Sequence, residues 1–184
     1  MADLAALRQH LLEHSVRRGD FILKSGRPSP YFLDSKQTAC RPGGMELVAD
    51  AALAAIPAEA TAIGGLTMGA DPVAYVTGAV AATRGRALKV FSVRKEVKGH
   101  GGGGRIAGAL DSGDRVVITE DTVSRGTSIM EAVEVVHEFG AQVVQILALV
   151  DRGGTCAAMA AAAGIPYVAL VTAPDLGFEY DGPS

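Results

Sequence analysis

The chain has 184 residues, of which 48% are hydrophobic and 20% charged, a balance typical of a globular protein with a substantial core. Its net charge of −3 argues against broad binding to nucleic acid, and polar or glycine interruptions in its apolar stretches argue against a membrane span. The two cysteines, Cys40 and Cys156, are too few and too far apart to define a disulfide framework or a zinc site. Since the N-terminus also has no signal-peptide pattern, we expect a cytoplasmic protein.

The first third of the chain combines two predicted helices with two predicted short strands. Residues 3–18 carry leucines at helical spacing and predict the first helix. Strands are predicted around residues 21–23 and 31–33, which are apolar or aromatic and are separated by a Gly/Pro turn. A second helix is predicted at residues 42–56, where Pro57 ends it.

From residue 62 onward, predicted strands and helices alternate. Strands are expected at residues 62–65, 88–93, 116–118, 143–150 and 167–171, and helices at 71–84, 128–139 and 155–163. This alternation is typical of an α/β fold with a doubly wound, mainly parallel sheet. No repeat or long linker divides the chain, so we expect a single domain over residues 1–184, with a small N-terminal subregion at about residues 1–40.

Polar or glycine residues lie at the carboxyl ends of four of the predicted strands. They are Gly64-Gly65, Arg94-Lys95, Glu120-Asp121 and Asp151-Arg152. Open α/β sheets bind ligands beyond the carboxyl ends of their parallel strands. We therefore expect these four strand ends to converge on one binding site.

The most informative stretch is residues 116–128, which read Val-Val-Ile-Thr-Glu-Asp-Thr-Val-Ser-Arg-Gly-Thr-Ser. It begins as a buried strand, passes the carboxylates Glu120 and Asp121, and ends in a hydroxyl-rich turn before a helix. Backbone N–H groups at a helix N-terminus suit a phosphate, whereas carboxylates suit hydroxyl groups. The pattern therefore indicates a ribose phosphate; the alternative is two solvated acids before an ordinary capped helix.

The whole stretch resembles the phosphoribosyl pyrophosphate signature of type I phosphoribosyltransferases. It has neither the Gly-Lys-Ser/Thr of a P-loop nor the G-x-G-x-x-G of a dinucleotide site. The resemblance implies that Glu120 and Asp121 hold the ribose hydroxyls. It assigns the 5-phosphate to the loop residues Thr122, Val123, Ser124, Arg125, Gly126, Thr127 and Ser128.

This loop departs from the commoner family pattern, which has Thr-Thr-Gly-Gly where this chain has Ser124-Arg125-Gly126-Thr127. Ser124 keeps a hydroxyl. Arg125 either adds a phosphate contact or points to solvent, and Thr127 reduces the freedom of the backbone where the family has glycine.

A basic, glycine-rich segment occupies residues 94–108. Six of the chain's 17 Lys and Arg residues lie between residues 86 and 105, with Glu96 as the one acid, and five of residues 99–104 are glycine. Such a segment is either a solvated flexible stretch or a mobile loop that closes over a polyanion. We expect the second, with the cations supplied by Arg94, Lys95, Lys98 and His100.

Three further segments narrow the resemblance to the orotate phosphoribosyltransferase family. Residues 94–101, R-K-E-x-K-x-H-G, resemble its catalytic loop, and residues 21–34 resemble its N-terminal substrate segment. Residues 64–72 resemble its pyrophosphate loop, and Asp151-Arg152 matches the Asp-Arg where the pyrimidine acid binds. The resemblance runs from about residue 20 to about residue 172.

The resemblance implies transfer of ribose 5-phosphate from phosphoribosyl pyrophosphate to orotate, giving orotidine 5-monophosphate and pyrophosphate in de novo pyrimidine (UMP) biosynthesis. Loop cations would stabilise the leaving pyrophosphate; these are the catalytic candidates Lys98, His100, Arg94 and Lys95. Lys24, Ser124 and Arg152 would contact orotate. Magnesium (Mg2+) would be carried by the substrate, with no metal ligand assigned to the protein. In the family the loop, here residues 94–108, reaches the neighbouring subunit's site, which implies a homodimer.

Two other interpretations stay open. A phosphoribosyltransferase for another base, such as a purine, would share the signature, but a substrate carboxylate explains Arg152 better. A regulator that senses phosphoribosyl pyrophosphate and binds nucleic acid would share the signature without the catalytic loop. This chain keeps the loop cations and a net negative charge, so we expect small-molecule substrates and neither nucleic acid nor membrane as partners.

Overall fold

The computed structural model describes residues 2–22, 26–97 and 104–182. A six-stranded sheet with the order β5-β4-β3-β6-β7-β8 lies at its centre, and neighbouring strands run parallel except β4 and β5. The strands are β3 (Ala62–Leu66), β4 (Lys89–Val93), β5 (Ile106–Gly108), β6 (Arg115–Val123), β7 (Gln142–Asp151) and β8 (Tyr167–Thr172). The prediction of a mainly parallel, doubly wound α/β sheet is confirmed.

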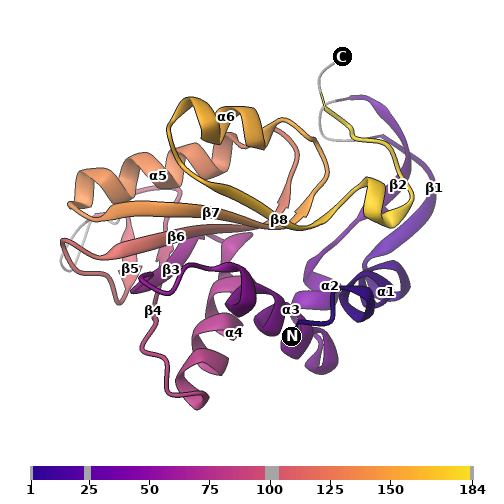
Figure 1. Ribbon diagram of the computed structural model, residues 1–184. Helices are drawn as coiled ribbons and strands as arrows, with labels where there is room; N and C mark the ends of the chain where they lie inside the picture. The colour runs from indigo at the N-terminus through magenta and orange to yellow at the C-terminus, as the bar shows by residue number, and fades with distance from the viewer. Residues whose placement is uncertain (1, 23–25, 98–103, 183–184) are drawn as a thin grey trace.

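Helices cover both faces of this sheet (Figure 1). One face carries α5 (Thr127–Phe139) and α6 (Cys156–Ala162), and the other carries α3 (Pro42–Ala55) and α4 (Ala70–Thr83). Val117 packs in the core on the α3 and α4 side, whereas Val116 and Ile118 pack on the α5 side. Successive side chains of a strand point to opposite faces, so burial on both faces explains the unbroken apolar run in β6.

A smaller antiparallel sheet lies beside the end of the main sheet where β6 and β7 finish (Figure 1). It consists of β1 (Val16–Ile22) and β2 (Pro28–Leu33), and it follows α1 (Leu4–His14) and precedes α2 (Lys36–Ala39). The contact is direct, because Arg152 after β7 donates to Ser29 and to the carbonyl of Tyr31 in β2. This placement brings N-terminal residues to the carboxyl ends of the parallel strands.

The prediction of a first helix over residues 3–18 was wrong at its end. Helix α1 stops at His14, and Val16 begins β1 by pairing with Leu33. Ser15, between them, is buried and hydrogen-bonds through its hydroxyl to the hydroxyl of Thr38 at 2.7 Å. Pairing and burial in the tertiary structure therefore override the helical spacing of the leucines.

Three short elements were not predicted: α2, β5 and a 3-10 turn at Pro174–Leu176. β5 lies in the predicted 94–108 loop and pairs with β4 as an edge strand. β6 also continues to Val123, so Glu120 and Asp121 lie inside a strand and not beyond its end. Pairing with a neighbour decides such elements, because they are too short to show a sequence period.

The remaining predicted strands and helices agree with the structure apart from shifts at their ends. Within the described residues, no helix combines the length and the apolar character that crossing a membrane requires.

Candidate active site

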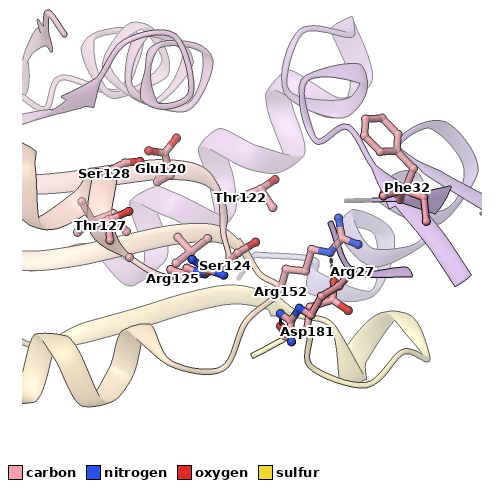
Figure 2. A pocket seen from close by; sticks show the side chains of 14 residues that line it. Arg27, Phe32, Glu120, Thr122, Ser124, Arg125, Thr127, Ser128, Arg152 and Asp181 are labelled. Carbon is pink, nitrogen blue, oxygen red and sulfur yellow. Dashed lines mark hydrogen bonds and ion pairs between the residues drawn. The ribbon is translucent and has the colours of Figure 1, made fainter. Parts of the chain in front are cut away.

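A pocket of about 650 Å³ opens where β6 and β7 end (Figure 2). Most of its wall comes from β6 and the turn that follows: Glu120, Thr122, Val123, Ser124, Arg125, Gly126, Thr127, Ser128 and Ile129. The rest comes from Ile22, Arg27, Phe32, Arg152 and Asp181. The structure thus brings the phosphate-loop candidates and the orotate candidate Arg152 into one cavity.

The floor of this pocket includes the N-terminus of α5. Gly126 precedes the helix with a φ of 76°, a left-handed conformation that favours glycine. No side chain among the described residues caps the first turn, so its N–H groups are left for a ligand. Thr127 and Ser128 are exposed at this turn. A helix N-terminus of this kind favours a phosphate.

Glu120 and Asp121 are buried beside this turn, at 8% and 6% exposure. Asp121 accepts hydrogen bonds at Oδ2 from the hydroxyl of Ser35 (2.9 Å) and from the ammonium of Lys36. Its Oδ1 accepts from the backbone N–H of Thr122 at 2.8 Å. The carboxylate is therefore held by the N-terminal subregion as well as by its own strand.

These surroundings shift the pKa of two neighbouring groups in the same direction for different reasons. Burial is the largest influence on Lys36 and lowers its pKa, but the hydrogen bond and charge of Asp121 oppose it, and the net pKa is raised. The pKa of Glu120 is raised to about 8, chiefly by burial and also by the nearby charge of Asp121. Burial and the charge of Asp121 therefore both favour the protonated form of Glu120.

The turn after β3, part of the predicted pyrophosphate loop, packs against the same carboxyl groups. A Cβ atom at Gly69 would lie 1.7 Å from Oε1 of Glu120 and 2.9 Å from Oδ1 of Asp121. The glycine is required there because no side chain fits beside the two carboxyl groups. The turn after β3 therefore does meet β6 at these carboxyl groups, but through Gly69; the predicted strand-end residues Gly64-Gly65 lie inside β3.

Arg152 is buried at 6% exposure at the end of β7. Its guanidinium stacks 4.3 Å from the centre of the Tyr31 ring and donates through Nη2 to Ser29 at 3.0 Å and to the carbonyl of Tyr31 at 3.2 Å. Its Nε donates to the carboxylate of Asp181, near the C-terminus, and Figure 2 shows these two side chains facing each other. The position predicted for an orotate carboxylate is thus in contact with a carboxylate of the protein.

The basic-loop candidates are not gathered in this pocket. Arg94 follows β4 and donates to the carbonyl of Ile106 at 3.2 Å, and Lys95 is exposed; neither lines the pocket. Lys98, His100 and the orotate candidate Lys24 lie outside the described residues. Within the described part of one chain, the basic residues predicted to bind pyrophosphate are therefore not brought to the pocket.

Comparison with known proteins decides the family. No family model matches the chain. A protein of Nostoc sp. named orotate phosphoribosyltransferase is 36% identical over 97% of this chain and 89% of its own length. A Mycobacterium tuberculosis orotate phosphoribosyltransferase, solved with Fe(III) dicitrate, superposes with a TM-score of 0.82 at 33% identity, covering 95% of this chain and 99% of that one. The same enzyme in complex with 5-phospho-alpha-D-ribosyl 1-diphosphate superposes with a TM-score of 0.79 at 31% identity over 95% and 99%.

The chain belongs to the orotate phosphoribosyltransferase family.

The sequence analysis missed Arg27 and Asp181, which line the pocket, and Ser35 and Lys36, which hold Asp121 beside it. Arg27 lies in the segment that resembles the family's substrate segment, and Ser35 and Lys36 follow it directly, so the segment gave a signal for all three. Asp181 lies beyond the resemblance, and nothing in its neighbours in sequence marks it. Only the folding of the C-terminal tail onto β7 brings it to Arg152.

Proposed function

We propose that this protein transfers the 5-phosphoribosyl group of phosphoribosyl pyrophosphate to orotate, giving orotidine 5-monophosphate and pyrophosphate. The observation that carries the proposal is that Glu120 and an uncapped helix N-terminus line one pocket, with the buried Asp121 directly beside Glu120. The first suits ribose hydroxyls and the second suits the 5-phosphate. Relatives that span nearly the whole chain and bear the enzyme's name support the same reaction.

In this proposal, the turn from Thr122 to Ser128 binds the 5-phosphate through backbone N–H groups and hydroxyls. Glu120 and Asp121 accept hydrogen bonds from the ribose hydroxyls. As the bond from the anomeric carbon to pyrophosphate breaks, positive charge grows on the ribose ring. The carboxylate of Asp121 beside the ring stabilises that charge, and its low accessibility strengthens the effect.

The base lies between the hairpin of the N-terminal subregion, about residues 1–40, and the loop that follows β7. Arg152 binds the orotate carboxylate, where a planar guanidinium suits two oxygens. Ser124 and Lys24 supply the remaining polar contacts of the base. Phe32 lines the same cavity and offers an apolar surface to the flat ring.

The leaving pyrophosphate is stabilised by Arg94, Lys95, Lys98 and His100 of the 94–108 loop. Since Arg94 and Lys95 do not line the pocket of their own chain, we propose that the loop serves the site of a neighbouring subunit in a homodimer. The whole chain, residues 1–184, acts as one domain in each subunit.

Magnesium enters with the substrate in this proposal. Asp121 is already engaged by Lys36 and Ser35, and Glu120 has a pKa of about 8, so the pair suits hydroxyl groups better than a bare cation. Phosphate oxygens are the ligands that this hard ion prefers. When bound, the ion would neutralise charge on the pyrophosphate, and Glu120 and Asp121 would hold the ribose hydroxyls.

The test is orotate consumption, followed by ultraviolet absorbance, with phosphoribosyl pyrophosphate and magnesium present. We expect turnover with orotate and none with adenine, hypoxanthine or uracil, and loss of turnover when magnesium is chelated. Asp121→Asn should lower kcat/KM by at least about tenfold. Asp111→Asn, an exposed acid remote from the pocket, is the matched control.

Turnover with another base would keep the reaction and overturn the assignment of orotate. No turnover with any base, together with tight binding of phosphoribosyl pyrophosphate, would instead favour the sensing regulator.

A further inference from the structure

The C-terminal tail, residues 177–182, is docked on the loop that follows β7. The backbone N–H of Asp181 donates to the carbonyl of Arg152 at 2.9 Å. Arg27, from the hairpin side of the pocket, donates to the carbonyl of Gly182 at 2.9 Å and to that of Asp181. Phe178 stacks on Tyr31 with 3.9 Å between the ring centres. The tail is thus held at Phe178 by stacking and at Asp181 and Gly182 by hydrogen bonds. Asp181 also lines the pocket.

Within this tail, Asp181 directs its carboxylate at the guanidinium of Arg152 (Figure 2). The two side chains are 7% and 17% exposed, so the pair is largely removed from water. An ion pair in that position is screened less than one at the surface. It occupies Nε, one of the donors with which an arginine binds a planar carboxylate in two-point fashion.

We propose that Asp181 sets the affinity and the selectivity of the base subsite by competing with the carboxylate of the substrate for Arg152. This inference rests on the proposed function, because it takes the base to be a pyrimidine with a carboxylate. Two carboxylates cannot share one guanidinium without repulsion, so binding of orotate exchanges Asp181 for the substrate. The tail then loses its ion pair and keeps the stacking of Phe178 on Tyr31.

Selectivity follows from the same exchange. Orotate replaces the ion pair that it breaks, because it brings a carboxylate to Arg152. A neutral pyrimidine such as uracil would leave Arg152 buried without a partner if it displaced Asp181, and it would meet a negative charge if it did not. Asp181 therefore lowers the affinity for orotate while it maintains the preference for a carboxylate-bearing base.

The test is calorimetric titration of the full chain with orotate and with uracil, followed by steady-state kinetics. We expect Asp181→Asn to tighten orotate binding by about tenfold and uracil binding by a larger factor, so that the preference for orotate narrows, with the KM for phosphoribosyl pyrophosphate unchanged. Asp181→Glu, which keeps the charge, should restore the original affinity. Glu179→Gln, an exposed acid in the same tail, should change nothing.

Removing the charge of Asp181 leaves a buried guanidinium, so thermal unfolding of each variant is measured alongside. A second variant that ends at Tyr180 removes the competitor by another route and should also bind orotate more tightly. Weaker binding of orotate in both variants would overturn the proposal, because Asp181 would then orient Arg152 for the substrate. Unchanged binding in both would overturn it as well.

The two proposals fail differently. If the unaltered protein does not bind orotate, the proposed function fails. If the unaltered protein binds orotate and turns it over but the Asp181 variants match it, only the competition by the tail fails.

Discussion

The ammonium of Lys36, on the first turn of α2, donates to Oδ2 of Asp121 in β6, and this bond joins the N-terminal subregion to the acidic pair. Ser35 donates to the same oxygen at 2.9 Å. The carboxylate that we assign to a ribose hydroxyl is therefore positioned from two parts of the chain far apart in sequence. Lys36 acts through Asp121 and is a positioning residue.

Lys36→Met should raise the KM for phosphoribosyl pyrophosphate by about tenfold, with a smaller change in kcat, because Asp121 loses a charged hydrogen bond that orients it. Lys36→Arg should recover most of the loss. Steady-state kinetics with phosphoribosyl pyrophosphate as the varied substrate is the measurement. Lys89→Met is the control, since Lys89 pairs with Asp111 and Asp114 away from the pocket. An unchanged KM in Lys36→Met would refute the positioning role.

The stability of the protein should fall as pH rises through the pKa of Glu120. This pKa is raised from 4.5 to about 8 by burial and by Asp121. The folded state therefore holds a proton that the unfolded state releases, so the contribution of this group is full below about pH 4.5 and is lost as pH rises toward about pH 8. Glu120→Gln should remove this loss and be more stable than the unaltered protein above about pH 8, by on the order of 1 to 3 kcal/mol.

Urea unfolding at several pH values measures this free energy directly. Glu134→Gln, which removes an exposed carboxylate of α5, should leave the pH profile unchanged. A profile of Glu120→Gln parallel to that of the unaltered protein would show that Glu120 is not the group responsible.

Gly69→Ala should damage the site without unfolding the protein. The new Cβ would lie 1.7 Å from Oε1 of Glu120, so the carboxyl group or the turn must move. We expect kcat/KM to fall by about a hundredfold, because a displaced carboxylate no longer meets the ribose. Gly43→Ala, where the nearest atom would be at 4.0 Å, is the control. Kinetics together with circular dichroism separates loss of activity from loss of fold. Activity equal to that of the control would show that a Cβ atom at residue 69 does not displace the carboxyl group of Glu120.

Arg125→Thr restores the family's commoner residue and tests what the arginine adds. Arg125 lines the pocket and is exposed beside the proposed phosphate site, so we expect a long-range attraction for the 5-phosphate. The KM for phosphoribosyl pyrophosphate should rise about threefold at low salt, with a smaller difference at high salt because exposed charges are screened. An identical KM at both salt concentrations would place Arg125 outside the phosphate site.

Mixing two inactive variants tests whether the 94–108 loop serves a neighbouring subunit. Lys98→Ala damages the loop and Asp121→Asn damages the pocket, so a mixed dimer contains one intact site and one doubly damaged site. Random mixing should restore about a quarter of the original activity, measured after the variants are unfolded and refolded together. Activity that stays at the level of the separate variants would mean that each loop serves its own chain.

The sequence by itself determined the alternation of strands and helices and the position of the hydroxyl-rich turn before α5. Both depend on local patterns: apolar runs of strand length, helical spacing in residues 128–139, and a hydroxyl- and glycine-containing turn typical of a strand-to-helix junction. Each of these patterns is contained in a short run of consecutive residues, so it can be recognised without knowing which other parts of the chain that run contacts. The sheet class and the pocket turn followed from them.

Tertiary structure decided what contacts those local elements. Val16–Arg18 became a strand because β2 was available to pair with it, against its helical surroundings in sequence. Lys36 and Asp121 are brought together from positions 85 residues apart, and Asp181 reaches Arg152 only because the C-terminal tail folds onto the loop that follows β7. The pairing of charges across such separations depends on burial and on the path of the chain, and these arise only when the whole molecule has folded.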